Sequence, residues 1–295
     1  MKTLYIVAGP TASGKTSFAI ELAQRLNTEI VSADSRQIFK EMNIGVARPT
    51  PEELSMVKHH LIASWSVLED YNVARYEKEA IQIIDFLFQT HDNLVLCGGS
   101  GMYINAIVNG IDEMPDCDAE IRKELQKTFE EKGLPYLQDL LKEKDPVYFS
   151  EVDIQNHRRV IRALEVCLQT GKPFSSFRLE RKAKRNFNIK IFGIEREREE
   201  LIERIDARVD LMMQMGQKEE ARELYKYKNL PSLSTVGYRE LFDYFDNRLT
   251  LDQAIEQIKI HTRQYAKRQM TWFRKTEGIN WLNFSKGNIN IEEII

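Results

Sequence analysis

The sequence predicts an α/β fold in which a parallel sheet is flanked by helices and an all-helical domain is inserted into the chain. Short apolar runs alternate with helical periodicity through the first hundred residues, which is the order typical of βαβ units. From about Asp118 to Gly171 the chain changes to charged, amphipathic segments with few β-branched residues. The length of 295 residues fits two folding units at ~150 residues each.

The first hundred residues carry the patterns of three buried strands that alternate with helices. Phe18, Leu22 and Leu26 recur at the spacing of one helix face, so a helix is expected directly after the first strand. Strands connected through helices in this way run parallel. The strands expected are 3–9 (TLYIVAG), 29–34 (EIVSAD) and 93–99 (NLVLCGG), and the helices are 15–26, 73–88 and a segment from about Met102.

The rest of the chain predicts a helical insertion followed by a return to the sheet. We expect a discontinuous core formed by residues 1–114 and 180–295, with a helical insertion domain at 115–179. The other features expected are helix breaks at 133–135 and 145–146, a strand at 188–195 (NIKIFGIE), helices at about 197–215 and 251–275, and a short tail element at 287–295.

Composition excludes several classes of protein. Apolar residues make up 42% of the chain, enough for a substantial core, and the formal charge of −3 argues against a protein that coats nucleic acid indiscriminately. Cys97, Cys117 and Cys167 have no paired spacing, and the five histidines do not predict a metal site. No signal peptide or membrane span is apparent, so we expect a cytoplasmic protein with no membrane partner.

A glycine-rich motif lies between the first strand and the first helix. GPTASGKT fits G-x-x-x-x-G-K-[ST], in which backbone amides converge on phosphate oxygens, Lys15 adds a charge and Thr16 can bind Mg²⁺. This motif makes the predicted sheet one of the P-loop NTPase-like type. The residues expected to hold a phosphate group are Gly9, Pro10, Thr11, Ala12, Ser13, Gly14, Lys15 and Thr16.

The residues that follow the strand at 94–96 argue against an ATPase. Nucleotide-hydrolysing relatives of this fold need a carboxylate after a later apolar strand to hold Mg²⁺, but this strand runs into Cys97, Gly98, Gly99 and Ser100.

Asp34 and Arg208 are candidate functional side chains with structural alternatives. Asp34 closes the second strand, where aspartate often caps a turn, but a carboxylate beside an anion cradle is electrostatically awkward unless metal or chemistry uses it. Arg208 follows Arg204 at i,i+4, which favours a nearby anion; it could equally pair with Glu203 or Asp210 on a charged helix.

The order of motifs closely resembles that of the bacterial tRNA dimethylallyltransferases over nearly the whole chain. The resemblance implies transfer of a dimethylallyl group from dimethylallyl diphosphate to N6 of adenosine 37 in tRNAs that read codons beginning with U. It implies that the glycine-rich loop holds the diphosphate with Mg²⁺, that Asp34 is the general base, and that Thr11 and Arg208 assist at the diphosphate. The motifs that carry the resemblance are GPTASGKT, SADSRQIFKEMNIG, GGSGMYINAIVNG (98–110), RRVIRALEV (158–166), STVGYRE (234–240) and TRQYAKRQMTWFRK (262–275).

The partner implied is the anticodon stem-loop of tRNA, bound by a chain that we expect to be a monomer. The segment from Lys259 to Lys275 has six basic residues and no acidic one, whereas solvated helix faces usually mix signs. Its Tyr265 and Trp272 are expected on or near the core-facing stripe. Ser100 stands where relatives usually carry threonine, and Arg158 where many carry glutamine. The residues expected at tRNA are Asp34, Ser35, Arg36, Gln37, Ser100, Arg122, Arg158, Arg159, Arg162, Lys267 and Arg268.

Three rival functions share parts of this pattern: a small-molecule kinase, a prenyltransferase that acts on free adenine nucleotides, and a non-catalytic RNA-binding protein. The helical insertion and the basic helix favour a macromolecular acceptor over the first two. The intact Gly14, Lys15 and Thr16 together with Asp34 disfavour the third.

Overall fold

A computed structural model of the chain describes residues 2–115, 118–178, 183–285, 287, 289 and 291–294. The chain forms two compact units, one of Met1–Val108 with Lys184–Ile295 and the other of Asn109–Ala183. Of the cysteines, Cys117 lies outside the described residues. None of the helices described is long and apolar enough to cross a membrane.

The first unit is built on a parallel sheet, as the sequence predicts. Among the described residues its six strands lie in the order β3-β2-β4-β1-β5-β6, and β1 pairs with both β4 and β5 so that Thr3 lies opposite Asn93 and Asn188. The two edge strands were not expected, because one is only two residues long and both are only partly buried. The strands are β1 (Thr3–Ala8), β2 (Ile30–Ser32), β3 (His59–His60), β4 (Asn93–Gly98), β5 (Asn188–Glu195) and β6 (Ile279–Asn283).

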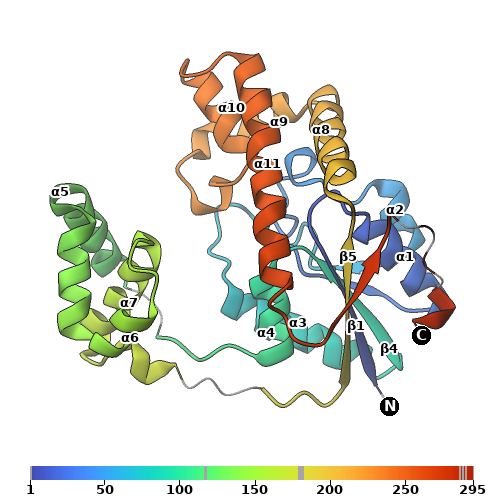
Figure 1. The fold of residues 1–295 in the computed structure, drawn as a ribbon, viewed down its shortest axis with the longest axis horizontal. Coiled ribbons are helices and arrows are strands. Elements are labelled where there is room, and N and C mark those ends of the chain that lie inside the picture. The colour runs from blue at the N-terminus through green and yellow to red at the C-terminus, as the bar shows by residue number, and fades with distance from the viewer. Residues whose placement is uncertain are drawn as a thin grey trace. The chain divides into compact units, whose positions relative to one another are not determined.

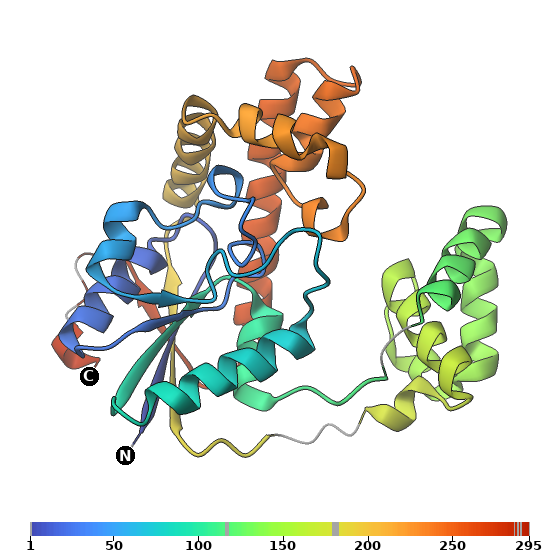
Figure 2. The ribbon, with the colours of Figure 1, turned by 180° about the vertical axis from the view of Figure 1, so that it is seen from behind.

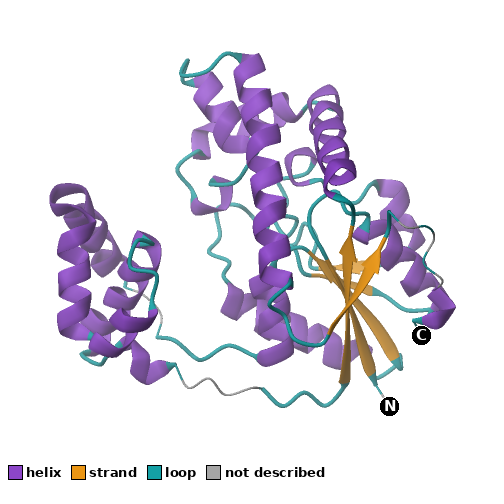
Figure 3. Cartoon of the chain, viewed as in Figure 1, coloured by secondary structure: helices purple, strands orange, loops and turns teal. Residues whose placement is uncertain are grey.

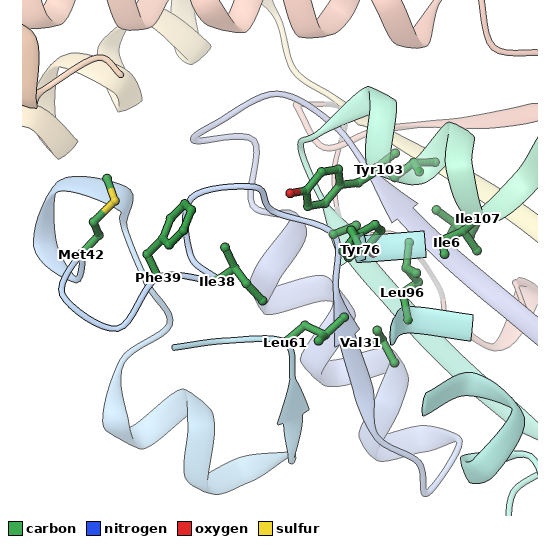
Figure 4. Close-up of a cluster of buried hydrophobic side chains, with 14 of the residues drawn as sticks. Ile6, Val31, Ile38, Phe39, Met42, Leu61, Tyr76, Leu96, Tyr103 and Ile107 are labelled. Atoms are coloured by element: carbon green, nitrogen blue, oxygen red, sulfur yellow. The ribbon is translucent and has the colours of Figure 1, made fainter. Parts of the chain in front are cut away.

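Alternate side chains of β1 enter two different cores, one on each face of the sheet. Leu4, Ile6 and Ala8 pack in a cluster that contains side chains of α3 (Val73–Leu87) and α4 (Gly101–Asn109). Figure 4 shows part of this cluster, in which the rings of Tyr76 and Tyr103 stack. Tyr5 and Val7 face the other way and pack with α1 (Lys15–Arg25). Burial on both faces holds β1, and therefore the loop that follows it, in a fixed position.

Beyond the ends of the strands stand α8 (Arg198–Gln214), α9 (Gln217–Leu224) and α10 (Tyr238–Phe245), and α11 (Leu251–Phe273) runs from them back toward α4 (Figures 1 and 3). The long helix α11 runs beside α10 and contacts α8. Short 3₁₀ turns occur at η1 (Ile44–Val46) and at η3 to η5. This unit also contains α2 (Pro51–Met56), and the turns are η3 (Tyr225–Tyr227), η4 (Pro231–Leu233) and η5 (Ile291–Glu293).

The second unit is helical, as Figure 2 illustrates, and side chains of these helices form its own apolar core. Its elements are α5 (Ala119–Lys144), α6 (Pro146–Glu151), α7 (His157–Thr170) and η2 (Phe174–Phe177). The expected break at residues 133–135 is a kink inside α5, where Gly133 adopts φ 74°. At the expected break near residue 145, the buried carboxylate of Asp145 accepts hydrogen bonds from Tyr148 N at 3.0 Å and from Ser175 N at 2.7 Å. It therefore links the start of α6 to η2.

Candidate active site

The glycine-rich loop joins β1 to α1 and is held from outside by two arginines. Arg204 Nε donates to the carbonyl of Ala12 and Arg196 Nε to that of Ser13, both at 2.8 Å. Gly9 cannot carry a side chain, because a Cβ there would lie 2.8 Å from the carbonyl oxygen of Ile194. The buried hydroxyl of Ser13 has no hydrogen-bond partner among the described residues. A rigid loop with an unsatisfied buried donor fits a bound anion.

Two cations face the space beside this loop. Lys15 Nζ donates to the carbonyl of Pro10 at 3.2 Å, and burial lowers the pKa of its ammonium, with a smaller contribution from the charge of Arg208. Burial also lowers the pKa of the Arg208 guanidinium, which has no ion pair among the residues that the structure describes. The structural alternative for Arg208 fails at Asp210, which pairs with Lys259 at 2.7 Å instead. Two cations that burial disfavours, side by side in one pocket, favour an anionic ligand.

Asp34 lies just beyond the end of β2 and both of its predicted roles are geometrically possible. Its Oδ1 accepts hydrogen bonds from Arg36 N at 2.9 Å and Gln37 N at 3.2 Å, so it does cap a turn. The carboxylate also lines the same pocket as Lys15. No hydrogen bond to Oδ2 is present among the described parts of the chain, so this oxygen is available to a ligand.

A close approach of two strands sets the position of Asp34. Ala33 N donates to the carbonyl of Cys97 at 2.7 Å, and a Cβ on Gly98 would lie 2.1 Å from the carbonyl oxygen of Ala33. Only glycine allows this approach. The Cys97 thiol lies near Lys15, and burial raises its pKa to about 12, so at neutral pH it is protonated and adds no charge to the site.

The residues after Asp34 are tied to three neighbouring segments. Ser35 N donates to the hydroxyl of Ser100 at 2.9 Å, Gln37 Nε2 to the carbonyl of Ala47 at 2.9 Å, and Arg36 Nη1 to that of Ser232 at 2.8 Å. Ser35, Arg36 and Gln37 line the pocket, whereas Ser100 does not and instead holds Ser35.

A single pocket of about 410 Å³ brings many of the expected site residues together. Thr11, Lys15, Thr16, Asp34 to Gln37, Arg208 and Arg268 all line it. This size lies within the ordinary range of ligand sites, ~300–1,000 Å³. Lys267 is exposed on α11 and does not line the pocket.

Several residues of the pocket were not anticipated from the sequence. Gln269 of α11 bridges two loops, because its Oε1 accepts from Thr11 N at 2.9 Å and its Nε2 donates to the carbonyl of Gly99 at 2.8 Å. Val209 and Met212 supply apolar surface beside Arg208. Met212 follows Arg208 by four residues and Val209 by three, and these spacings, which place side chains on one helix surface, are the available sequence signal. Gln217 also lines the pocket.

The basic segment of α11 is only partly free. Lys259 pairs with Asp210 at 2.7 Å, and Arg263 Nε donates to Asp206 Oδ1 at 2.9 Å. Two of the six basic side chains are therefore neutralised by carboxylates of α8. Lys267 and Arg268 are exposed and make no ion pair with any described residue. Tyr265 and Trp272, expected on or near the core-facing stripe, are 37% and 42% exposed. Tyr265 lines the pocket, and the ring of Trp272 packs against Gly101.

The arginines expected at tRNA in the second unit divide into two pairs. Arg122 and Arg162 contact the buried carboxylate of Glu165, at 2.7 and 3.3 Å. This packing within the unit gives both a structural task that sequence reasoning missed. Arg158 and Arg159 are exposed at the start of α7.

A glycine-rich anion cradle between the first strand and first helix of a parallel sheet defines a P-loop protein. The model of one family, described as IPP transferase, matches residues 37–276. The chain belongs to this family.

Named relatives match nearly the whole chain. A tRNA dimethylallyltransferase of Christiangramia forsetii is 49% identical over 98% of this chain and 96% of its own length, and that of Flavobacterium johnsoniae is 47% identical over 97% and 94%. The structure is similar to the full-length tRNA isopentenylpyrophosphate transferase of Bacillus halodurans, with a TM-score of 0.73, 34% identity and coverage of 100% and 94%. It also resembles a eukaryotic dimethylallyltransferase acting on tRNA, with a TM-score of 0.82, 26% identity and coverage of 97% and 74%.

Proposed function

We propose that the protein transfers a dimethylallyl group from dimethylallyl diphosphate to N6 of adenosine 37 in the anticodon loop of tRNAs that read codons beginning with U. Diphosphate is released. The observation that carries the proposal is the single pocket in which the anion cradle, two cations and the carboxylate of Asp34 face one space. Membership of the IPP transferase family and the activity in its relatives' names support the same reaction.

The reaction requires a strong electrophile because the lone pair of the adenine amine is delocalised into the ring. The bond between C1 of the allyl group and the diphosphate oxygen breaks as the departing diphosphate is stabilised. The loop amides, Lys15 and Arg208 supply that stabilisation, and Thr11 lies beside them in the pocket. Val209 and Met212 offer apolar surface to the hydrocarbon.

Asp34 completes the reaction by removing a proton. As N6 bonds to C1, its proton becomes strongly acidic, so position matters more than basicity for the group that accepts it. Asp34 Oδ2 takes this proton while Oδ1 stays engaged in the turn. The nitrogen is left neutral and the carboxyl group protonated.

Mg²⁺ is the ion that the donor set would accept. Thr16 lines the pocket at the cradle, and a hydroxyl oxygen beside phosphate is a typical Mg²⁺ environment. No group of three or more histidine, cysteine, aspartate or glutamate side chains gathers among the described residues, so diphosphate oxygens and water would complete the coordination. When bound, the ion would neutralise charge on the leaving group.

The residues at the end of β4 weaken the kinase alternative. β4, next to β1, ends in Cys97 and Gly98. A nucleoside triphosphatase of this fold would hold its metal with a carboxylate at such a strand end. No observation favours ATP over an allylic diphosphate here.

The proposed contact with tRNA combines the free basic surface of α11 with the second unit. Lys267 and Arg268 would bind backbone phosphates, as would Arg158 and Arg159. Ser35, Arg36 and Gln37 would contact the bases beside the target, and Ser100 would support Ser35. We propose that the second unit grips the anticodon stem and that the protein acts as a monomer.

The test is transfer to tRNA and to free AMP measured in parallel. The protein is incubated with Mg²⁺, dimethylallyl diphosphate and either unmodified tRNA or AMP, and products are identified by mass spectrometry. We expect a mass gain on one adenosine of the tRNA and little product from AMP. Equal transfer to AMP would indicate the nucleotide prenyltransferase, and ATP-dependent phosphorylation without transfer would indicate the kinase.

A further inference from the structure

Gln217 is a buried polar side chain that the reaction proposed above does not use. It begins α9 directly after Gly216, has no exposed surface, and lines the pocket that contains Asp34. Neither its amide nitrogen nor its amide oxygen has a hydrogen-bond partner among the described residues. A buried amide left unpaired is destabilising, so such a group in a binding pocket indicates a ligand that pairs with it.

The polar groups around Gln217 are already paired with one another. Both carboxylate oxygens of Glu220 are engaged: they accept hydrogen bonds from the backbone amides of Asn43, Ile44 and Gly45, at 3.0, 2.8 and 2.9 Å, and from the Tyr238 hydroxyl at 2.6 Å. This network holds η1 against α9 and Tyr238 and provides nothing for Gln217. On another side lies Gly237, where a Cβ would come within 2.5 Å of Gln217 Nε2. Because Gly237 has no side chain, there is room for the amide of Gln217.

The same wall of the pocket is connected to Asp34. Gln37 N donates to Asp34 Oδ1 at 3.2 Å, and Gln37 Nε2 donates to the carbonyls of Val46 and Ala47 at 3.3 and 2.9 Å. Gly45, Val46 and Ala47 line the pocket together with Gln217. Asp34 and Gln217 thus line one pocket, in which a single flat ligand would meet both side chains.

A carboxamide with both atoms free matches a ligand with an adjacent donor and acceptor. Adenine presents this pair as the N6 amine beside N7, and glutamine binds both atoms at once in nucleic-acid recognition. The apolar allyl group would leave both amide atoms unpaired. We infer that Gln217 is a specificity-determining residue that binds the N6 and N7 edge of the adenine to be modified, with Oε1 accepting one N6 proton, Nε2 donating to N7, and the other N6 proton left for Asp34. This inference rests on the proposed function.

The test is a cycle that combines a protein change with an atomic change in the substrate. Anticodon stem-loops carrying adenosine or 7-deazaadenosine at the target position are prenylated by the wild-type protein and by Gln217→Leu, and kcat/KM is measured for all four pairs. We expect Gln217→Leu to lose about 5- to 100-fold with adenosine. We expect a much smaller further loss when 7-deazaadenosine is used with this variant, because the N7 contact is already absent.

Each outcome of this cycle decides the inference. The inference is overturned if the losses in kcat/KM from Gln217→Leu and from 7-deazaadenosine multiply when the two changes are combined. It is also overturned if kcat/KM of Gln217→Leu is unchanged, which would indicate that water alone satisfies the amide. If the wild-type protein transfers no dimethylallyl group to either stem-loop, the proposed function is wrong, and the inference that rests on it is wrong as well. Gln217→Met, with an unbranched side chain of similar length, repeats the cycle if leucine packs poorly.

Thermal stability separates a recognition role from a structural one. Gln269 is the matched control, because it is also buried in the pocket wall but has partners at both amide atoms. Gln269→Leu should lower Tm, since Thr11 N and the Gly99 carbonyl lose their partner. Gln217→Leu should leave Tm unchanged or raise it, because two unpaired polar atoms are removed. A fall in Tm as large as that of Gln269→Leu would overturn the inference.

Discussion

The two oxygens of Asp34 have different surroundings. Oδ1 accepts two backbone hydrogen bonds within the turn at Arg36 and Gln37, whereas Oδ2 has no hydrogen bond from any described residue. The turn therefore orients the carboxylate without occupying the oxygen that would face the substrate. Because the two oxygens have different partners, a substitution at Asp34 can remove the proposed base and keep the turn.

Replacement of Asp34 by asparagine should lower kcat by at least about 100-fold, in line with the usual contribution of a general base. The amide keeps an acceptor for Arg36 N and Gln37 N, so the turn and the affinity for the anticodon stem-loop should persist. Single-turnover transfer rates and stem-loop binding are the measurements. Unchanged turnover in a correctly folded variant would refute the assignment of the base.

Lys15 predicts a link between diphosphate binding and pH. Burial holds the folded pKa of Lys15 below 10.5, the value of an unperturbed lysine, so between the two values the unfolded chain binds more protons and stability rises with pH. A bound diphosphate reverses this shift by favouring the charged form. Inorganic diphosphate should therefore bind with proton uptake in the same alkaline range.

Calorimetry in buffers of different ionisation enthalpy measures this uptake. The wild-type protein should show it and Lys15→Met should lose it together with most of the affinity. Equal proton uptake in both would mean that another group near the cradle is responsible.

At the residue scale, sequence reasoning finds the side chains that belong to local motifs. The residues Gly9 to Thr16 and Asp34 directly follow strands, so their positions follow from the strand pattern. Gln217 and Gln269 reach the pocket from α9 and α11, and only tertiary packing brings them there. The ion pair of Arg122 could not be predicted for the same reason, because its partner Glu165 lies on another helix.

At the scale of elements, α11 combines a structural and a proposed binding surface. Lys259 and Arg263 fasten the helix to α8, and Lys267 and Arg268, which pair with no residue that the structure describes, follow later in the helix. Composition alone cannot separate these halves, because the acidic partners lie on a different helix. Electrostatic contact with tRNA should therefore depend on the later half.

Lys267→Glu should weaken tRNA binding and reduce the slope of log affinity against log salt by about 0.7 to 1 for the lost phosphate contact. Lys78→Glu on α3 is the matched control: it changes net charge equally, and Lys78 is exposed and does not line the pocket. Filter binding over a range of salt concentrations measures both. If the two variants behave alike, α11 is not the contact.

The elements that sequence reasoning missed are short or lie at edges. His59 and His60 form only a two-residue strand, and Ile279–Asn283 pairs only with β5 among the described strands. Such strands carry little periodicity to recognise. By contrast the central strands are buried on both faces and give apolar runs, which is why these strands could be predicted.

At the scale of the whole molecule, the two units have separate cores and should lose structure separately. Arg122 and Arg162 compensate the buried carboxylate of Glu165, which is 3% exposed. Replacing both arginines by alanine should destabilise the second unit by about 1 to 3 kcal/mol, because the buried carboxylate of Glu165 loses these two charged partners. Hydrogen exchange should accelerate in α7 and remain unchanged in β1.

Lys127→Ala is the control for this experiment, because its partner Glu131 is exposed and surface pairs contribute little. It should leave exchange in α7 close to that of the wild-type protein. Equal acceleration in β1 for the double arginine variant would show that the two units unfold as one.

The most direct measurement is a crystal structure of the protein with inorganic diphosphate, Mg²⁺ and an unmodified anticodon stem-loop. We expect the diphosphate on the amides of the Gly9 to Thr16 loop and the target adenine in the same pocket, with N6 within hydrogen-bond distance of Asp34 Oδ2 and clear space toward the diphosphate for a five-carbon group. An adenine bound elsewhere, or a carboxylate of Asp34 turned away from it, would contradict the proposed reaction.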